Sequence, residues 1–419
     1  MGDKGFFCKD GLWYCDKLSL LELREDLGRK YSRPTPVMVY SQQKLIDNLK
    51  AYQCCASSSI EIGYSMKANN NLQLLKIIAA HVDRIITVSG YEIQMALRAG
   101  FKNESVIYNG NGKERWEIEL AIKENCLLNV DSQFDANHIV EAVTKLEKEA
   151  KVFVRVNPNL NPEVHPYIST GLADSKFGVE IAQLPEVLSI LKHPGVKVVG
   201  LHCHLGSTIK SIDIFKDAAI ILNKLGTKLR QDGFPNLEYL NLGGGLGIDY
   251  TGEDVLPQPS DMISAIRQEV SPEFKIIVEP GRSIVGNAGA LLVDVIGTKK
   301  NVAKSFVIIN GAMNDVLRPS MYSGYHRITP LQVHQSAEMG KYDVVGPICE
   351  SADFLGKDRM LPALEEGESL AILDCGAYCS AMASNYNLRG RAMEVMVEDY
   401  SWRVVRTREG LEDIISCME

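Results

Sequence analysis

The sequence predicts an α/β protein in which a closed (β/α)8 barrel carries a C-terminal β-rich domain. Two observations support this fold class. Between about residues 36 and 285, short β-branched runs alternate with longer segments of helical periodicity, which is typical of a parallel sheet. After about Gly286, strands follow one another without long helices, which indicates a separate domain. A chain of 419 residues is long enough for two domains.

Eight short runs are expected to form the strands of a TIM-like barrel. They are residues 60–66, 84–88, 105–108, 127–130, 151–156, 196–202, 237–242 and 275–278. Helices are expected between them at residues 72–80, 92–99, 133–149, 213–232 and 259–269. Eight strand–helix units are what a closed barrel of this kind requires.

The domain boundaries follow from the same patterns. Residues 36–285 are assigned to the barrel, and residues 1–35 and 286–419 to the β-rich domain. The C-terminal strands of the β-rich domain are expected at residues 291–296, 305–309, 342–345, 369–373, 392–397 and 402–407. A strand at residues 12–15 and a helix near residues 20–30 are grouped with them.

The composition argues against several function classes. The net charge of −8 includes no basic cluster for nucleic acid or an anionic membrane. No apolar run approaches the roughly 20 residues that cross a bilayer, and residues 1–18 lack the pattern of a signal peptide. The ten scattered cysteines predict reduced thiols and no structural zinc. We therefore expect a small-molecule substrate and a cytoplasmic location, or a plastid if a transit peptide has been removed.

Polar residues or glycines stand at or just after the predicted ends of successive barrel strands. They are Lys67, Ser89, Asn109, Asp131, Asn157, His204, Gly243, Gly244, Gly245 and Glu279. The carboxyl ends of barrel strands lie on one face, where the catalytic groups of such barrels gather. The alternative is that these residues are polar only because loops are polar.

Lys67 ends an apolar strand within Tyr64-Ser65-Met66-Lys67. We expect it to be buried at the barrel mouth, where a lowered pKa would leave a free amine. Such an amine can attack an aldehyde and form an imine, which is how pyridoxal phosphate is held in proteins. The alternative is an exposed lysine beside a turn.

A phosphate site is predicted at the loops after the seventh and eighth strands. Residues 243–245 are a triple glycine, and Glu279-Pro280-Gly281-Arg282 follows the eighth strand. Bare backbone amides in a glycine-rich turn can approach phosphate oxygens closely. The spacing does not match Gly-x-Gly-x-x-Gly, which disfavours a dinucleotide fold. A simple tight turn is the alternative.

Glu279 is expected to contact the pyridine nitrogen of the cofactor, where a carboxylate keeps the ring protonated and able to accept electrons. His202 and His204 are two residues apart, and no further ligand nearby completes a metal site, so no metal is predicted. A histidine that stacks on the cofactor is the preferred interpretation, and a histidine satisfied in the core is the alternative. Ser207, further into the loop, can donate to phosphate.

Three segments of the β-rich domain are too rich in proline, glycine and mixed polar residues for plain strands. They are residues 314–322, which include Arg318 and Tyr322, residues 346–353, which include Cys349 and Glu350, and residues 374–378. A thiol beside carboxylates in a loop is unusual unless it is used, because structural cysteines are commonly buried and inert. The alternative is a surface arginine and an idle cysteine.

Residues 165–171, 175–178 and 377–387 add further motifs to these segments. With them, the chain resembles over nearly its full length the diaminopimelate decarboxylases of the fold-type III pyridoxal-phosphate group, together with the related ornithine decarboxylases. The resemblance implies a barrel and β-domain of the alanine racemase and ornithine decarboxylase type, with pyridoxal 5'-phosphate as cofactor. It also implies a head-to-tail homodimer in which the Cys349-Glu350 loop completes the partner's active site.

The resemblance further implies roles for individual residues. Lys67 would form the imine, His204 would stack on the ring and Glu279 would hold the pyridine nitrogen. The phosphate would be surrounded by Ser207, Gly243, Gly244, Gly245, Gly281 and Tyr378, the last of which also reaches the substrate. The distal end of the substrate would be bound by Arg282, Arg318, Tyr322 and Glu350. Cys349 would be the acid that protonates the α-carbon.

Two carboxylate-binding arginines favour meso-diaminopimelate over ornithine, which has no distal carboxylate. The expected reaction is decarboxylation at the D-centre to L-lysine and carbon dioxide, the last step of lysine biosynthesis. Decarboxylation of ornithine, lysine or arginine is the nearest alternative, and a regulatory binding protein that has lost its cofactor is the alternative outside enzymes. Ile86 departs from the resemblance, because many members of the family carry an aspartate there.

Overall fold

The structure, a computed structural model, describes residues 5–161, 175–333 and 337–418. It divides into two compact units. The barrel unit comprises Leu49–Gly247 and Leu256–Arg282, and the β-rich unit comprises Met1–Asn48, Ile248–Val255 and Ser283–Glu419. The motif at residues 165–171 lies outside the described residues.

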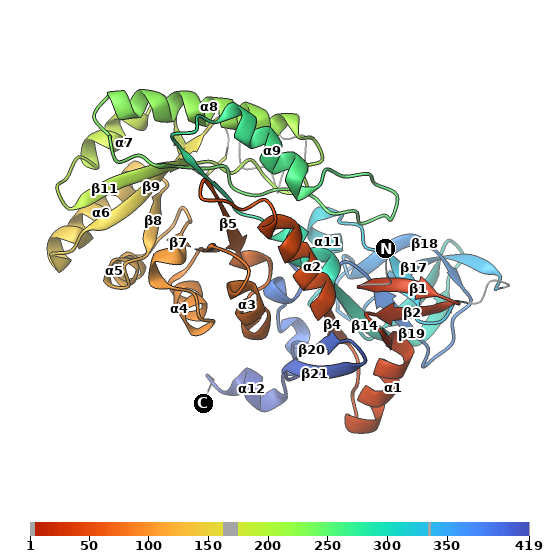
Figure 1. Cartoon of the computed structure of the whole chain (residues 1–419). Helices are drawn as coiled ribbons and strands as arrows, with labels where there is room; N and C mark the ends of the chain where they lie inside the picture. Colours follow the sequence, from red (N-terminus) through yellow and green to blue (C-terminus); the bar gives the residue numbers. More distant parts are fainter. Residues whose placement is uncertain (1–4, 162–174, 334–336, 419) are drawn as a thin grey trace. The chain divides into compact units, whose positions relative to one another are not determined.

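Eight parallel strands close into a barrel within the described part of the barrel unit, which confirms the predicted fold class (Figure 1). In order around the barrel they are β5 (Ile60–Ser65), β6 (Arg84–Thr87), β7 (Val106–Tyr108), β8 (Leu127–Val130), β9 (Ala150–Asn157), β11 (Val196–His202), β12 (Tyr239–Asn241) and β13 (Lys275–Val278). β13 pairs with β5 and so closes the ring, and the short β10 (Val179–Glu180) pairs with β9. Each predicted strand is found within two residues at either end.

Helices cover the outside of the barrel strands (Figure 1). They are α3 (Leu72–Ala79), α4 (Gly90–Arg98), α5 (Arg115–Lys123), α6 (Gln133–Leu146), α7 (Leu184–Ile190), α8 (Asp213–Gln231) and α9 (Pro259–Glu269). α5 and α7 were not predicted. The start of α5 is hard to recognise because Glu114 caps it together with Glu117, whereas helix starts commonly show serine, threonine, asparagine or aspartate.

The interior of the barrel is packed with apolar side chains. One buried cluster consists of Ile86, Ile107, Leu127, Phe153 and Ile277. Gly200 on β11 leaves room for Phe153, because a Cβ at this position would lie 2.5 Å from the phenyl ring. A packed interior leaves ligands to the strand ends and to the loops that follow them.

The β-rich unit is built on a sheet whose strands lie in the order β18 (Phe354–Pro362), β17 (Met339–Val345), β15 (Ser305–Ile309), β14 (Gly289–Lys300), β4 (Val37–Ser41), β20 (Met393–Glu398) and β21 (Ser401–Arg406). β14 also pairs with β19 (Ser369–Ile372), which pairs with β16 (Ile328–Pro330). A smaller sheet contains β1 (Phe6–Lys9), β2 (Leu12–Cys15) and β3 (Leu18–Ser19). The helices in and at the edges of this unit are α1 (Leu20–Lys30), α2 (Gln42–Gln53), α10 (Arg282–Val285), α11 (Arg318–Tyr322) and α12 (Leu411–Ile415).

Residues 36–48 were assigned to the barrel, but the structure places them in the β-rich unit. β4 pairs with β14 and with β20, for example Met38 with Leu291 and Val39 with Val395. All five residues of β4 are buried, so the strand has the continuous apolar sequence of a barrel strand. Its sequence therefore does not indicate which sheet it joins. Ile248–Val255 likewise belongs to the β-rich unit.

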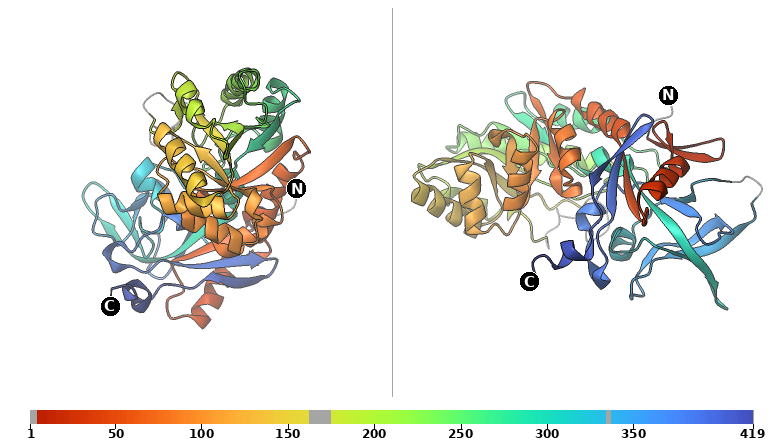
Figure 2. Two further views of the ribbon diagram at one scale, coloured as in Figure 1. Left: turned by 90° about the vertical axis from the view of Figure 1, so that its left-hand side faces the viewer. Right: turned by 90° about the horizontal axis from the view of Figure 1, so that it is seen from below.

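α1 completes the apolar core of the β-rich unit. Leu20, Leu23 and Leu27 are fully buried in a cluster with side chains of β4, β14 and β20. Trp402 of β21 packs against this cluster, and its indole N–H donates to Asp26 at 3.3 Å. Figure 2 shows α1, in dark red, near the blue strands β20 and β21. The N-terminal segment thus packs on the C-terminal strands.

In the described part of the chain, no helix is long and apolar enough to cross a membrane. The ten cysteines are all free thiols, of which five are buried.

Candidate active site

Lys67 lies in the 3₁₀ turn Met66–Ala68, directly after β5, and lines a cavity of about 360 Å³. Other walls of the cavity come from residues at the ends of further barrel strands, among them Val88, Asn109, His204 and Glu279. The Lys67 side chain is exposed, so the predicted burial is wrong. The reason is that Lys67 belongs to the turn and not to the strand, which places its side chain at the open mouth of the cavity.

The triple glycine after β12 approaches neighbouring backbone too closely for any other residue. A Cβ on Gly244 would lie 2.1 Å from the carbonyl oxygen of Glu279, and a Cβ on Gly245 would lie 2.6 Å from that of Gly206. Gly243 and Gly245 also have positive φ angles of 66° and 128°. The turn therefore requires glycine. Two of its backbone amides already have side-chain partners, because the N–H of Gly243 donates to the side-chain oxygen of Asn241 at 2.9 Å and that of Gly244 donates to Nδ1 of His204 at 3.3 Å.

The glycine loops adjoin the turn that carries Lys67. A Cβ on Gly281 would lie 3.1 Å from the Cβ atoms of both Ser65 and Ala68. The Ser65 hydroxyl donates to the backbone carbonyl of Glu279 at 3.0 Å. The amine-bearing turn and the predicted phosphate loops therefore form one continuous surface of the barrel unit.

Ser207 and Arg282 contact each other at the same loops. The Ser207 hydroxyl oxygen accepts hydrogen bonds from Nε and Nη2 of Arg282 at 3.2 and 3.0 Å. The backbone N–H of Ile209 donates to the carbonyl of Gly245 at 2.8 Å, which holds the Ser207 loop against the triple glycine. The buried guanidinium of Arg282 adds a positive charge to these loops, which suits an anionic ligand.

The Glu279 carboxylate is buried and held by amides and an imidazole. Asn241 donates to Oε1 at 2.6 Å, Asn109 lies 3.4 Å from the same oxygen, and His202 Nε2 lies 3.5 Å from Oε2. Asn129 links two of these groups, because its amide donates to Asn109 at 2.9 Å and to Nδ1 of His202 at 2.7 Å. His202 accepts at Nδ1, so its Nε2 carries the hydrogen and faces the carboxylate.

This network keeps Glu279 charged and His202 neutral. Burial raises the pKa of Glu279, but its contacts with His202 and Asn241 outweigh burial, and the pKa lies below its ordinary value. Burial also lowers the pKa of His202, despite the opposing effect of the Glu279 charge. A buried carboxylate that stays charged among neutral donors favours a positively charged partner in the cavity.

His204 lines the cavity and contacts the glycine turn. The backbone N–H of Gly244 donates to its Nδ1 at 3.3 Å. Burial, together with the positive charges of Lys67 and Arg155, holds the pKa of His204 well below its usual value. The ring is therefore neutral, and a neutral imidazole can stack on an aromatic ligand without repelling a positive charge on it.

Arg155 and Asn129 belong to the site but were not predicted. The buried Arg155 lies on β9, where its guanidinium is 3.4 Å from the Asp131 carboxylate and 4.5 Å from the centre of the Phe177 ring. Asn129 lies on β8 and connects Asn109 with the histidine beside Glu279. A signal was present in both cases, because each is a polar residue between two apolar neighbours of a barrel strand, where it must be satisfied by hydrogen bonds.

In the β-rich unit, the segments that carry Arg318 and Cys349 lie side by side. The buried carboxylate of Asp353 accepts the backbone N–H of Met313, directly before the Arg318 segment, and that of Ile348 in the Cys349 segment, both at 2.7 Å. The hydroxyl of Ser320 on α11 also donates to the carbonyl of Ala352 at 2.6 Å. The two segments are thus held together by contacts that the sequence does not reveal.

Cys349 and Glu350 are exposed at the tip of their loop. The backbone N–H of Cys349 donates to the side-chain oxygen of Asn387 at 2.9 Å, and the hydroxyl of Tyr386 donates to the Glu350 carboxylate. Tyr386 and Asn387 lie in the motif at residues 377–387, in which only Tyr378 has a predicted role. They hold the loop without covering the thiol.

Arg318 begins α11 and is buried, whereas Tyr322 ends the helix and is half-buried. Tyr378 is half-buried in the loop after β19 and has a φ of 57°. A bulky residue other than glycine rarely adopts this left-handed conformation, which costs roughly 1–3 kcal/mol and is found most often at functional sites. The conformation is consistent with the predicted role of Tyr378.

The predicted site residues therefore form one group in each unit. The barrel unit holds Lys67, His204, Ser207, Gly243, Gly244, Gly245, Glu279, Gly281 and Arg282. The β-rich unit holds Arg318, Tyr322, Cys349, Glu350 and Tyr378.

The barrel group fits pyridoxal phosphate by its chemistry. The buried guanidinium of Arg282 and the hydroxyl of Ser207, which contact each other at the glycine loops, suit a phosphate. The charged carboxylate of Glu279 suits a protonated ring nitrogen, and the exposed amine of Lys67 lines the same cavity. An aldehyde, a ring cation and a phosphate would each find a complementary group here.

Comparisons with known proteins agree with this chemistry. The profile of the family described as pyridoxal-dependent decarboxylase, pyridoxal binding domain, matches residues 42–286. A probable chloroplastic diaminopimelate decarboxylase from Oryza sativa subsp. japonica is 42% identical, over 96% of this chain and 82% of the relative. The diaminopimelate decarboxylase of Aquifex aeolicus is 39% identical, over 97% of this chain and 96% of the relative.

Solved structures give the same result. The crystal structure of diaminopimelate decarboxylase from Helicobacter pylori complexed with L-lysine has a TM-score of 0.89 and 36% identity, and the match covers 94% of this chain and 98% of that one. The sequence matches extend over both units of the chain and include the residues of the barrel cavity. The chain belongs to the pyridoxal-dependent decarboxylases and, within them, to the diaminopimelate decarboxylase family.

Proposed function

We propose that the protein decarboxylates meso-diaminopimelate at its D-centre and releases L-lysine and carbon dioxide, with pyridoxal 5'-phosphate as cofactor. The observation that carries this proposal is a single cavity lined both by the exposed amine of Lys67 and by the buried, charged carboxylate of Glu279. This cofactor needs two groups from the protein. One is an amine that holds its aldehyde, and the other is a carboxylate that keeps its ring nitrogen protonated.

The barrel group would hold the cofactor. Lys67 would bind its aldehyde carbon, His204 would stack on the ring, and Glu279 would retain a proton on the ring nitrogen. The phosphate would be surrounded by Gly243, Gly244, Gly245 and Gly281, together with Ser207 and Tyr378. When bound, pyridoxal phosphate supplies an acceptor for the electron pair that remains when carbon dioxide leaves.

The β-rich group would bind the rest of the substrate and supply a proton. Arg318 and Tyr322, with Arg282 of the barrel unit, would bind the distal carboxylate, and Glu350 would bind the distal amine. The thiol of Cys349 would donate its proton to the α-carbon after the bond to the carboxyl carbon breaks. Because Cys349 is exposed, its thiolate can recover a proton from water.

We also propose that two copies form a head-to-tail dimer in the cytoplasm, or in a plastid, and that the Cys349-Glu350 loop completes the partner's site. Mixing and reassociating the inactive variants Lys67→Ala and Cys349→Ala tests the dimer. Shared sites predict that the mixture regains about a quarter of the wild-type activity, because half of the dimers then contain one intact site. A mixture that stays inactive while exchanging subunits contradicts shared sites.

The direct test of the reaction is purified protein with pyridoxal phosphate and a substrate panel of meso-diaminopimelate, ornithine, lysine and arginine. The expected result is carbon dioxide and L-lysine from meso-diaminopimelate alone. Turnover of ornithine in its place would reassign the substrate, and no product from any of the four would reject decarboxylation.

A further inference from the structure

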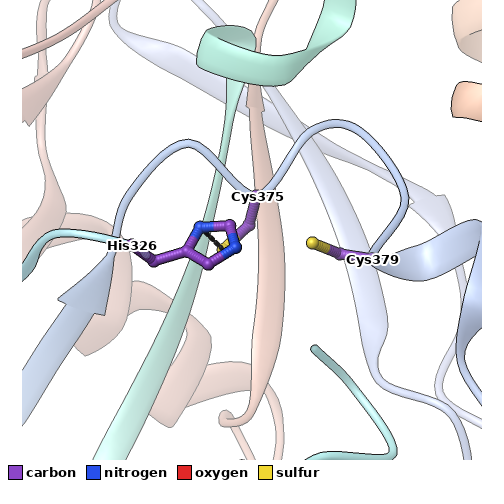
Figure 3. A group of neighbouring side chains, drawn as sticks. All are labelled: His326, Cys375 and Cys379. Atoms are coloured by element: carbon purple, nitrogen blue, oxygen red, sulfur yellow. Dashed lines mark hydrogen bonds between the residues drawn. The ribbon is translucent and has the colours of Figure 1, made fainter. Parts of the chain in front are cut away.

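A buried cluster around His326 lies next to Arg318 in the β-rich unit. His326, Cys375 and Cys379 place three potential metal-ligand atoms within 4.8 Å of one another, and Figure 3 shows the sulfur of Cys379 directed toward the other two. The hydrogen bonds of His326 argue against a metal ion. Its Nε2 lies 2.7 Å from Nη1 of Arg318, and its Nδ1 lies 2.8 Å from the carbonyl oxygen of Leu373.

These two contacts fix the protonation state of the imidazole. The guanidinium of Arg318 can only donate, so Nε2 of His326 must accept. The carbonyl of Leu373 can only accept, so Nδ1 must carry the hydrogen. His326 is therefore neutral, and both of its nitrogens are occupied, which leaves no lone pair for a metal ion.

Arg318 is held on a second side by an aromatic ring. Its guanidinium carbon lies 4.3 Å from the centre of the Tyr250 ring. The same ring meets His326 edge to face, with centres 5.4 Å apart and an interplanar angle of 80°. Tyr250 and His326 thus orient the guanidinium through a stacked face and one N–H group.

The positive charge of Arg318 is not neutralised by these neighbours. Arg318 is only 5% exposed, and its Nε has no hydrogen-bond partner among the described residues. Asp374, a nearby carboxylate, pairs instead with Arg327 at 3.0 Å. A buried guanidinium that is oriented by neutral groups keeps its charge for a ligand anion.

We infer that His326 is a positioning residue that sets the specificity for a distal carboxylate, because it orients Arg318 without neutralising its charge. The inference rests on the proposed function, in which Arg318 binds this carboxylate. A carboxylate at position 326 would form an internal ion pair with Arg318 and compete with the ligand. A neutral acceptor there leaves the guanidinium available.

The test compares His326→Gln with His326→Glu, two side chains of equal shape that differ in charge. Equilibrium binding to the holoenzyme is measured with L-lysine, which retains the carboxylate of the L-centre, and with 1,5-diaminopentane, which lacks it. We expect His326→Gln to bind L-lysine within about threefold of the wild type, because an acceptor remains. We expect His326→Glu to bind L-lysine about 10- to 100-fold more weakly, with unchanged affinity for 1,5-diaminopentane.

Equal affinity of the Gln and Glu variants for L-lysine would overturn the inference. An equal loss of affinity for L-lysine and 1,5-diaminopentane in His326→Glu would also overturn it. His81→Gln, at a half-buried histidine of the barrel unit, controls for the replacement itself. If the variants at 326 do not fold, Tyr250→Leu provides the test, with Tyr250→Phe as its control. Loss of the stacked face should weaken the binding of L-lysine about tenfold more than the binding of 1,5-diaminopentane. An equal change in affinity for the two ligands would count against positioning.

Binding separates this inference from the proposed reaction. A wild-type protein that binds L-lysine through Arg318 but releases no carbon dioxide from meso-diaminopimelate would contradict the reaction and leave the role of His326 intact. Normal turnover with no charge effect at position 326 would contradict the role of His326 alone.

Discussion

The two units hold their site residues in different ways. In the barrel unit, Glu279 is buried and receives hydrogen bonds from side chains fixed on neighbouring strands, such as Asn241 at 2.6 Å. In the β-rich unit, Cys349 and Glu350 are exposed on a loop that is held mainly through its backbone. Strand register thus preorganises one group, whereas loop contacts position the other.

The difference fits the roles that we propose for the two groups. A cofactor that stays bound gains from a rigid, charged and desolvated site, because the protein then does not reorganise during the reaction. A substrate must enter and leave, and a proton donor must be recharged by water. Exposure of Cys349 suits that cycle, while exposure of Glu279 would weaken its interaction with a ring nitrogen.

The largest effect is expected from Lys67→Ala. Loss of the amine should remove the visible absorbance of the bound cofactor and lower kcat by about 10⁴-fold or more, because both attachment and orientation are lost. Lys76→Ala, at an exposed lysine of α3, is the matched control and should keep the absorbance and the rate. Persistence of the band in Lys67→Ala would remove Lys67 from its role.

Glu279→Gln should lower kcat by about 10²- to 10³-fold with the fold intact, because a neutral amide no longer stabilises a positive ring nitrogen. The control is Glu117→Gln, at a second buried carboxylate of the same barrel, which accepts from Gly90 and Tyr108 at 2.7 Å each. This control should lose about 1–3 kcal/mol of unfolding free energy while kcat stays unchanged. Steady-state kinetics and urea unfolding separate the two outcomes, and similar kinetic losses at both sites would contradict the assignment.

Cys349→Ala should lower kcat by about 100-fold while the cofactor absorbance remains, because only the proton donor is removed. Cys417→Ala, at another exposed thiol, should behave as the wild type. Spectra and kcat are measured on the same preparations. Full activity of Cys349→Ala would show that another group protonates the α-carbon.

The smallest effect concerns stability and not the reaction. Burial raises the pKa of Asp315, in the β-rich unit, to about 6. Because this folded-state pKa exceeds the ordinary value, Asp315 stabilises the fold at low pH, and this contribution is lost as pH rises through about 6. Relative to Asp315→Asn, the wild type should lose about 2 kcal/mol of unfolding free energy between about pH 4 and pH 7. Denaturant unfolding at the two pH values measures this difference, and parallel curves for the two proteins would contradict it.

Much of the barrel and of its cofactor group was predictable because the signals are local. The runs at residues 127–130, 196–202 and 275–278 match β8, β11 and β13 to the residue. The triple glycine at residues 243–245 predicted a tight turn after the seventh strand. The structure agrees, because a Cβ at any of these positions would clash with neighbouring backbone. β18 was missed because Lys357, the left-handed Asp358 and Arg359 interrupt its apolar pattern.

The sequence by itself determined the order of the barrel strands, the residues at their ends and the charge types available to a ligand. These depend on side-chain periodicity and on chemistry within a few residues, which a linear pattern records. Only the tertiary structure decided that β4 pairs with β14 and β20, that Lys67 is exposed, and that His326 orients Arg318. Such outcomes depend on contacts between segments far apart in the chain, and local preference does not specify a partner.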